Sequence, residues 1–547
     1  MKGYDMPDKY YQGFDATVSH FYEASTNDMT SLEVWCYTDK LSYLSGEVVS
    51  FHLSATADLV EMTIYREGGD RTHVHNTTIS NCSLYPTGSD FFSKGCEWPV
   101  GYQWTLPDNI ASGFYLVMCS VISDDGKIQQ HEAGFFVRPN SKKPTGQVLL
   151  IAATSTWIAY NDWGGTNGYV GEGKDLTGGK SSHLSIHRPW AKGFLSLPPN
   201  APRKPHRYKV KPGNIPRYPP IEFAYTRGYS KYYANAGWAS YEGPFARWLE
   251  DSGYKVDYIT QHDLHYYPEL LDQYSCILTV GHDEYWSFEM REAIDSYVEQ
   301  GGHHARFAGN FCWQIRLENS GCTQVSYKED AAAKDPVNNT DQQHLLTSVW
   351  EDPLVGWNGA SSIGLNALWG IYAGVGHIAP RQGGGFTVYR PEHWALVNTE
   401  LCFGDQFGGE AKIFGYEVDG LDYLIKDGLP EPTYSDGAIP GTEIIAMGLA
   451  GNLEADHHDR QATLYYASSC TDLAGMAHCR YGDTSPESLD KAARGSGMIV
   501  SCQKGRGEIF NAGSCEWVAG LIERDPYTET ITRNVLDRFI QSTQDKT

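Results

Sequence analysis

Long apolar runs and an excess of basic residues are both missing from this sequence. No stretch approaches the roughly 18 consecutive apolar residues of a membrane-spanning helix, and residues 1–6 hold no apolar core of signal-peptide length. Lys and Arg number 43 against 67 Asp and Glu, which leaves a formal net charge of −24. Because nucleic-acid phosphates require a basic face, this balance argues against nucleic-acid binding. We therefore expect a soluble, cytoplasmic protein that binds neither nucleic acid nor membrane.

Closely paired cysteines are also missing. The 12 cysteines are scattered without a C-x-x-C pair, so the sequence indicates neither a structural zinc site nor a disulfide framework. Cys276 lies inside an apolar run and is typical of a small buried hydrophobic residue. The chain is nevertheless rich in core-forming residues, with 41% hydrophobic and 13% aromatic side chains over 547 residues. This length exceeds what one core supports, so we expect more than one domain.

Residues 1–141 have the pattern of a β domain. Val49, Phe51 and Leu53 alternate with polar neighbours, as half-buried strands require. Short turn segments rich in Gly, Asp and Pro separate the apolar stretches. The pattern predicts a β-sandwich over residues 1–141, followed by a polar, proline-flanked linker at 138–144.

Residues 146–547 alternate between apolar strands and amphipathic helices. The apolar runs at 148–152 and 276–280 have the length of buried strands, and a helical pattern follows the second. Such alternation fits right-handed crossovers, so we predict an α/β fold with a doubly wound parallel sheet. Two long inserts interrupt it, one at 161–240 without clear periodicity and a mainly β one at about 320–500.

The most informative stretch follows the apolar run at 276–280. After Gly281 the chain presents four polar or aromatic side chains in a row, at 282–285. At the carboxyl end of a parallel strand, the side chains of the next turn project into the crevice above the sheet. His282 and Glu284 could there transfer protons or bind a metal. The plainer interpretation is a turn whose acids favour the dipole of the following helix.

Several stretches, taken together, resemble one protein family. They are residues 156–161, 185–189, 241–242, 248–250, 281–287, 309–316 and 415–420. With them the chain resembles the large-subunit domain of N,N-dimethylformamidase and its relatives over roughly residues 146–540, and the β domain is similar to those that precede this domain in relatives. The resemblance implies a glutamine-amidotransferase-like fold and one ferric iron held by two tyrosinates and a carboxylate. It also suggests a small partner subunit, with a homo-oligomer as the alternative.

By this resemblance, Tyr241 and Tyr285 correspond to the two tyrosine ligands of the iron. Phenolate is a hard anionic donor, and two phenolates with a third anion would stabilise ferric iron. The family's third ligand is a glutamate, but the corresponding stretch here, 341–350, contains none. His344 is the residue of that stretch best able to bind a metal, so we predict it as the third ligand.

The rest of the expected site consists of proton-transfer groups and a substrate pocket. We expect His282 and Glu284 to move protons. The insert at 161–240 would shape the pocket, whose polar residues we expect to be Asn161, Arg188, Asn310 and Glu417. Glu351 and Glu417 are alternative third ligands. These assignments predict an iron-dependent hydrolase that cleaves the C–N bond of a small, linear, formamide-like amide.

Two other functions stay open. Cys312 follows the strand expected at 305–308, and amidotransferase-like folds often place a thiol nucleophile on the sharp turn after a central strand. A thiolate there needs a base such as His282 or His303. Alternatively, the aromatic-rich chain is a non-catalytic protein whose Trp and Tyr rings stack on a ligand. That interpretation leaves the polar cluster at 282–285 unexplained.

Overall fold

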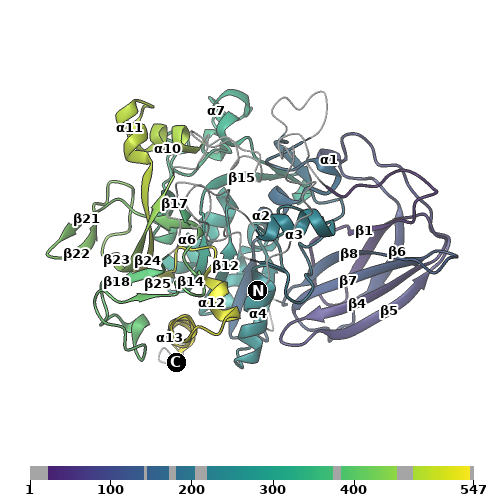
Figure 1. Ribbon diagram of the computed structural model, residues 1–547, viewed down its shortest axis with the longest axis horizontal. Helices are drawn as coiled ribbons and strands as arrows, with labels where there is room; N and C mark the ends of the chain where they lie inside the picture. The colour runs from purple at the N-terminus through teal and green to yellow at the C-terminus, as the bar shows by residue number, and fades with distance from the viewer. Residues whose placement is uncertain are drawn as a thin grey trace.

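The computed structural model describes residues 22–140, 144–171, 180–203, 219–373, 384–452 and 472–541. They form a β-sandwich, at the right of Figure 1, and a larger α/β part beside it. The linker expected at 138–144 falls partly outside these ranges. Among the helices of the described ranges, none combines the length and apolarity needed to cross a membrane.

Two sheets build the sandwich. One has the strand order β1 (Val34–Thr38), β3 (Val48–Ala55), β6 (Val100–Thr105). The other has the order β2 (Ser42–Tyr43), β8 (Ile128–Val137), β7 (Gly113–Ile122), β4 (Val60–Glu67), β5 (Thr72–Ile79), and helix α1 (Phe91–Lys94) lies between β5 and β6 along the chain. Val49, Phe51 and Leu53 are all buried in the core that the two sheets share. Their alternation therefore marks the inner face of β3.

The α/β part is organised around one sheet of 11 strands. Five parallel strands come first, in the order β11 (Val256–Thr260), β9 (Val148–Ala152), β12 (Cys276–His282), β14 (His303–Gly309), β25 (Gly507–Asn511). Antiparallel strands continue it: β24 (Arg494–Lys504), β23 (Glu443–Gly451), β17 (Asn366–Ala373) and β20 (Tyr416–Gly420), with β18 (Phe386–Val388) and β19 (Gln406–Phe407) beside β23.

The predicted parallel sheet is therefore present as five strands, and the mainly β insert predicted at about 320–500 does form strands, but most of them are antiparallel and continue that sheet. Only residues 505–506 separate β24 from β25, and a two-residue hairpin joins antiparallel neighbours. The strands expected in an insert at about 320–500 thus extend the same sheet, as the green ribbons of Figure 1 show.

Helices cover both faces of the parallel strands. On one face, α4 (Glu242–Asp251), α12 (Trp517–Ile522) and α13 (Pro526–Gln541) share a core with Leu150 and Leu278. On the other, α5 (Gln261–Tyr266) and α6 (Phe288–Glu299) pack on Leu149 and Ile277. Neighbouring residues of one strand face opposite ways, so an uninterrupted apolar run satisfies both layers. Ser287 caps α6, because its hydroxyl accepts a hydrogen bond from the Met290 N–H at 3.2 Å.

Smaller elements complete the α/β part. A four-stranded sheet has the order β10 (His183–Ser185), β16 (Thr323–Val325), β15 (Trp313–Glu318), β13 (Tyr285–Ser287). The hairpin β21 (Tyr423–Lys426) and β22 (Leu429–Pro432) projects at the left of Figure 1. The remaining helices are α2 (Thr154–Tyr160), α3 (Pro219–Arg227), α7 (Ala331–Lys334), α8 (Ala360–Ile363), α10 (Asp472–Tyr481) and α11 (Pro486–Ala492). Because β13 follows β12 at once, the small sheet lies over the carboxyl end of the parallel strands.

Candidate active site

One buried polar cluster forms where the parallel strands β12, β14 and β25 end. His282 ends β12, Asn310 follows β14, Cys515 follows β25, and Glu417 comes from β20. At Gly309 an added Cβ atom would lie 2.6 Å from the Cys515 nitrogen and 2.9 Å from the Glu417 carbonyl oxygen. Glycine at the end of β14 therefore allows the other two segments to approach so closely.

His282 lies at the centre of the cluster. Its Nε2 atom is 2.8 Å from a carboxylate oxygen of Glu417 and 3.2 Å from one of Glu284. Its Nδ1 atom is 2.7 Å from the carbonyl oxygen of Asn235, which fixes the ring orientation. Burial disfavours the charged ring, but the two carboxylates outweigh it and raise the pKa of His282 well above its usual value. The ring therefore bridges two acids, and both acids favour its protonated form.

The two carboxylates that flank His282 differ in proton affinity. Burial alone would raise both pKa values. For Glu284, the hydrogen bond from His282 and the positive charges of His282 and Lys328 reverse this, and its pKa is lowered. For Glu417, burial prevails with help from the negative charge of Glu284, so its pKa is raised. Glu284 is thus the permanent anion and Glu417 the better proton acceptor.

Two tyrosine hydroxyls lie near the carboxylate of Glu284, one of them in direct contact with it. The hydroxyl of Tyr169 donates to Glu284, whose oxygens lie 2.9 and 3.0 Å away, and it is 2.6 Å from the hydroxyl oxygen of Tyr285. The Tyr160 ring packs against Tyr169 with centroids 4.5 Å apart and against His282 at 5.2 Å. Two phenols and one carboxylate therefore converge on a single point.

A buried lysine lies beside these tyrosines. The Lys328 ammonium is 3.3 Å from the ring centroid of Tyr169, 5.2 Å from that of Tyr285 and 5.6 Å from that of Trp313. These distances place it over aromatic faces that attract cations. Burial lowers the pKa of Lys328 to about 8, although the charge of Glu284 opposes the shift.

Asn310 connects Glu417 with His282. Its side-chain amide nitrogen lies 3.0 Å from a Glu417 oxygen and 3.2 Å from His282 Nε2. Its backbone has a φ of 62°, a left-handed conformation that asparagine tolerates better than most residues. The Asp419 carboxylate accepts the N–H of Asn310 at 2.8 Å and that of Phe311 at 3.3 Å, which holds this turn in place.

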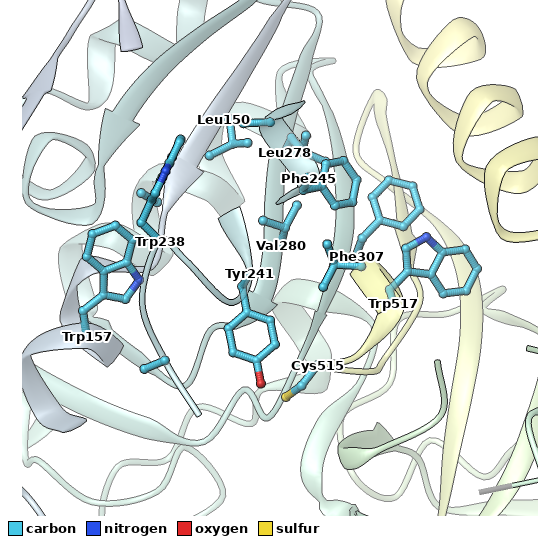
Figure 2. Packing of buried hydrophobic residues seen from close by; sticks show 14 of the residues in the cluster. Leu150, Trp157, Trp238, Tyr241, Phe245, Leu278, Val280, Phe307, Cys515 and Trp517 are labelled. Carbon is cyan, nitrogen blue, oxygen red and sulfur yellow. The ribbon is translucent and has the colours of Figure 1, made fainter. Parts of the chain in front are cut away.

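Tyr241 and Cys515 also lie at this end of the strands (Figure 2). The Tyr241 hydroxyl donates to the Ala234 carbonyl oxygen at 3.0 Å and to Glu516 at 3.1 Å. Figure 2 shows this hydroxyl and the Cys515 sulfur pointing to the same end of the strands. The Cys515 sulfur and ligand atoms of His282 and Glu417 lie within 4.8 Å of one another, so these three could hold a metal ion softer than ferric iron.

Residues 61–529 match the family described as N,N-dimethylformamidase beta subunit-like, C-terminal. The chain belongs to this family. Among its relatives is the N,N-dimethylformamidase beta subunit of Paracoccus aminophilus, 23% identical over 499 residues, and that of an Alcaligenes species, 22% identical over 479 residues. Each alignment covers 82% of this chain and 55% of the relative, so the chain spans about half the length of these relatives.

The family membership confirms the resemblance predicted from the sequence. The sporulation control protein Spo0M of Bacillus subtilis, a solved structure, covers 20% of this chain and 51% of its own length at 12% identity. Its TM-score of 0.15 is too low to support an argument.

The cluster around His282 contains five of the residues selected from the sequence: His282, Glu284, Tyr285, Asn310 and Glu417. The structure does not bring His344 to it. The His344 ring is exposed and packs edge-on against Phe288, with centroids 5.2 Å apart. Glu351 is half-buried elsewhere and accepts the Gly359 N–H at 2.9 Å.

The other selected residues lie around the cluster. Asn161 donates to the Pro189 carbonyl oxygen at 2.9 Å and Arg188 to that of Thr166 at 2.7 Å, so both brace the insert through buried backbone contacts. Cys312 is buried, and its N–H donates to the Glu284 carbonyl oxygen at 3.3 Å.

Sequence reasoning missed Tyr169, Tyr160 and Cys515. Tyr160 lies within one of the stretches that carry the family resemblance, which was a usable signal. Tyr169 follows Gly168 in an insert without periodicity, and nothing local marks it. Cys515 was one of many scattered cysteines, and only its position after β25 distinguishes it.

Proposed function

We propose that this protein hydrolyses the C–N bond of a small linear amide, as the names of its relatives suggest. The observation that carries the proposal is the buried ring of His282, held between Glu284 and Glu417 beside tyrosine hydroxyls. Amide hydrolysis needs a group that activates the carbonyl for attack by water and another that takes a proton from that water and gives it to the departing nitrogen. Both needs have candidates in this cluster.

The residues of the cluster fit the iron implied by the family resemblance. Burial raises the pKa of Tyr169 and Tyr285, so both phenols stay neutral unless a strong cation lies beside them. Their hydroxyls and Glu284 form a hard oxygen donor set of two phenols and a carboxylate. We assign the ligands to Tyr169, Tyr285 and Glu284, in place of the set with Tyr241 and His344. Bound ferric iron would act as a Lewis acid on an amide carbonyl.

Glu417 is the proton-transfer group of this proposal. Its raised pKa suits a carboxylate that accepts a proton and later releases it, whereas Glu284 stays ionised. The hydrogen bond from Asn310 at 3.0 Å orients Glu417. His282, when protonated, offsets the negative charge of the Glu284 and Glu417 carboxylates. Asn310 and His282 therefore position the acid.

The substrate of the proposal is a small formamide-like molecule, and a partner subunit belongs to the proposal as well. The relatives are named beta subunits, which supports assembly with a second kind of chain. We also propose that the five parallel strands are the amidotransferase-like half of the fold.

The test is to assay purified protein, loaded with iron or stripped by a chelator, on formamides and acetamides. Amine and carboxylate should appear in equal amounts with the iron-loaded protein. Cys312→Ser should keep this activity, because Cys312 has no part in the mechanism. Full activity of the metal-free protein, lost in Cys312→Ser, would favour the thiol enzyme instead. No turnover in any form would favour the interpretation as a non-catalytic ligand-binding protein.

A further inference from the structure

A small cavity lies where three segments of the chain meet, away from the cluster around His282. Glu67 and Arg71 reach it from the end of β4 and the turn that follows, Arg203 from the insert, and Arg247 from α4. Its volume is about 40 Å³. At roughly 10–15 Å³ for each water-sized group, this space suits a ligand, or the end of a ligand, of a few heavy atoms.

The charges around this cavity are mainly positive. Arg71 is paired with Glu67, with 2.5 Å between Nε and the carboxylate oxygen. Arg203 donates instead to the carbonyl oxygen of Ala239, and in the described ranges neither Arg203 nor Arg247 has a carboxylate within ion-pair distance. Burial lowers the pKa of Arg203, and the charge of Arg247 lowers it further, so the two guanidinium groups repel each other.

Neighbouring acids do not neutralise this arginine pair. Burial raises the pKa of Glu132 against the smaller effect of the Arg71 charge, and the Glu132 carboxylate accepts a hydrogen bond from the Ser196 hydroxyl. In a chain with a net charge of −24, two arginines at one cavity without an acid of their own are unusual. Among the described residues, no carboxylate pairs with Arg203 or Arg247 to offset their repulsion.

We propose that this cavity is a binding site for a small oxyanion, held by Arg203 and Arg247. The planar fork of a guanidinium donates two parallel hydrogen bonds to phosphate, sulfate or carboxylate oxygens. Chloride offers no such pair of acceptors. Because the cavity joins the sandwich, the insert and α4, the bound anion stabilises their junction. A ligand that binds only the folded state raises the melting temperature in a saturable way.

The experiment titrates full-length protein with sodium phosphate, sodium sulfate or sodium formate at a constant ionic strength set by sodium chloride. Melting temperature and isothermal titration calorimetry are the readouts. We expect saturable binding and a rise in melting temperature for an oxyanion but not for chloride. Comparing the tetrahedral anions with formate tells a phosphate-type ligand from a carboxylate. Arg247→Gln should raise Kd about tenfold, since it removes one charge-assisted pair.

Arg247 is exposed on α4, so its replacement by Gln leaves the fold intact, and circular dichroism verifies this. The more buried Arg203→Gln variant should lose binding as well. Arg494→Gln is the matched control, because Arg494 is exposed and pairs with Asp490 far from the cavity. No anion-specific binding, or binding that is the same in Arg247→Gln and Arg203→Gln as in the wild type, would overturn the proposal.

Discussion

The Nε2 atom of His282 lies 2.8 Å from a carboxylate oxygen of Glu417. The two residues are 135 positions apart in the sequence. The same nitrogen lies 3.2 Å from Glu284, which follows His282 after a single residue. One acid is therefore local to the strand end and the other arrives from a distant strand. Burial and charge then separate the pKa values of the two acids in opposite directions, which is the pattern expected of groups with different catalytic roles.

The first prediction concerns the iron ligands. Tyrosinate bound to ferric iron gives a visible charge-transfer band, so the iron-loaded protein should be coloured. Tyr169→Phe and Tyr285→Phe should each weaken or abolish the band, because the first removes the phenol that donates to Glu284 and the second removes the phenol whose hydroxyl contacts that of Tyr169. Visible absorption with iron content per chain is the measurement.

Tyr241→Phe serves as the matched control for these variants. Its hydroxyl is committed to Ala234 and Glu516, so we expect its colour and iron content to match the wild type. Loss of colour in Tyr241→Phe with a normal band in Tyr169→Phe would restore the ligand set expected from the sequence.

The second prediction concerns the buried ion pair between Arg306 and Asp283. The Arg306 guanidinium donates to the Asp283 side chain, and its Nη2 donates to the Asp283 carbonyl oxygen at 3.2 Å. Arg306→Met leaves Asp283 as an unpaired buried charge, which should cost about 3–5 kcal/mol of unfolding free energy. Urea denaturation measures this loss.

A double variant separates pair loss from a general packing defect. Arg306→Met combined with Asp283→Asn should recover part of the stability, since no lone charge remains. A single Arg306→Met variant as stable as the wild type would show that the pair contributes nothing.

The third prediction is a pH dependence of stability that comes from His131. Burial lowers the pKa of His131 to about 4, although its contact with the Trp190 carbonyl oxygen opposes the shift. A depressed pKa means that the unfolded chain binds the proton first. Its contribution to stability is full above pH 6.5 and is lost as the pH falls towards 4. Between pH 7 and 5 the loss should be about 2 kcal/mol.

His131→Gln tests this contribution, because glutamine stays neutral across the range. Urea denaturation at pH 7 and pH 5 should show a smaller loss of stability in the variant than in the wild type. An equal loss in both proteins would assign the acid sensitivity to other groups.

The sequence allowed the strand end at 276–287 to be recognised because its signals are local. An uninterrupted apolar run predicts a buried strand, and Ser287 before an amphipathic pattern predicts a helix start. The structure agrees on both. The antiparallel half of the sheet was missed because its strands are separated by long segments and only their pairing shows the direction.

Tyr169 shows why the candidate site could be predicted only in part from the sequence. It meets Glu284 across 115 residues, from an insert whose course depends on tertiary packing rather than on periodicity. His344 was selected by the chemistry of its side chain within an aligned stretch, yet that stretch forms a short exposed turn. Residue type alone does not tell which way such a turn faces.

The activity of Glu417→Gln is the most direct test of the proposed function. The substitution keeps the shape of the side chain and the contact with Asn310 but removes the acid that accepts a proton. With iron content unchanged, kcat for amide cleavage should fall about 10²–10⁴-fold, the usual contribution of a general acid–base group. An iron-replete Glu417→Gln protein that releases amine at the wild-type rate would contradict the account.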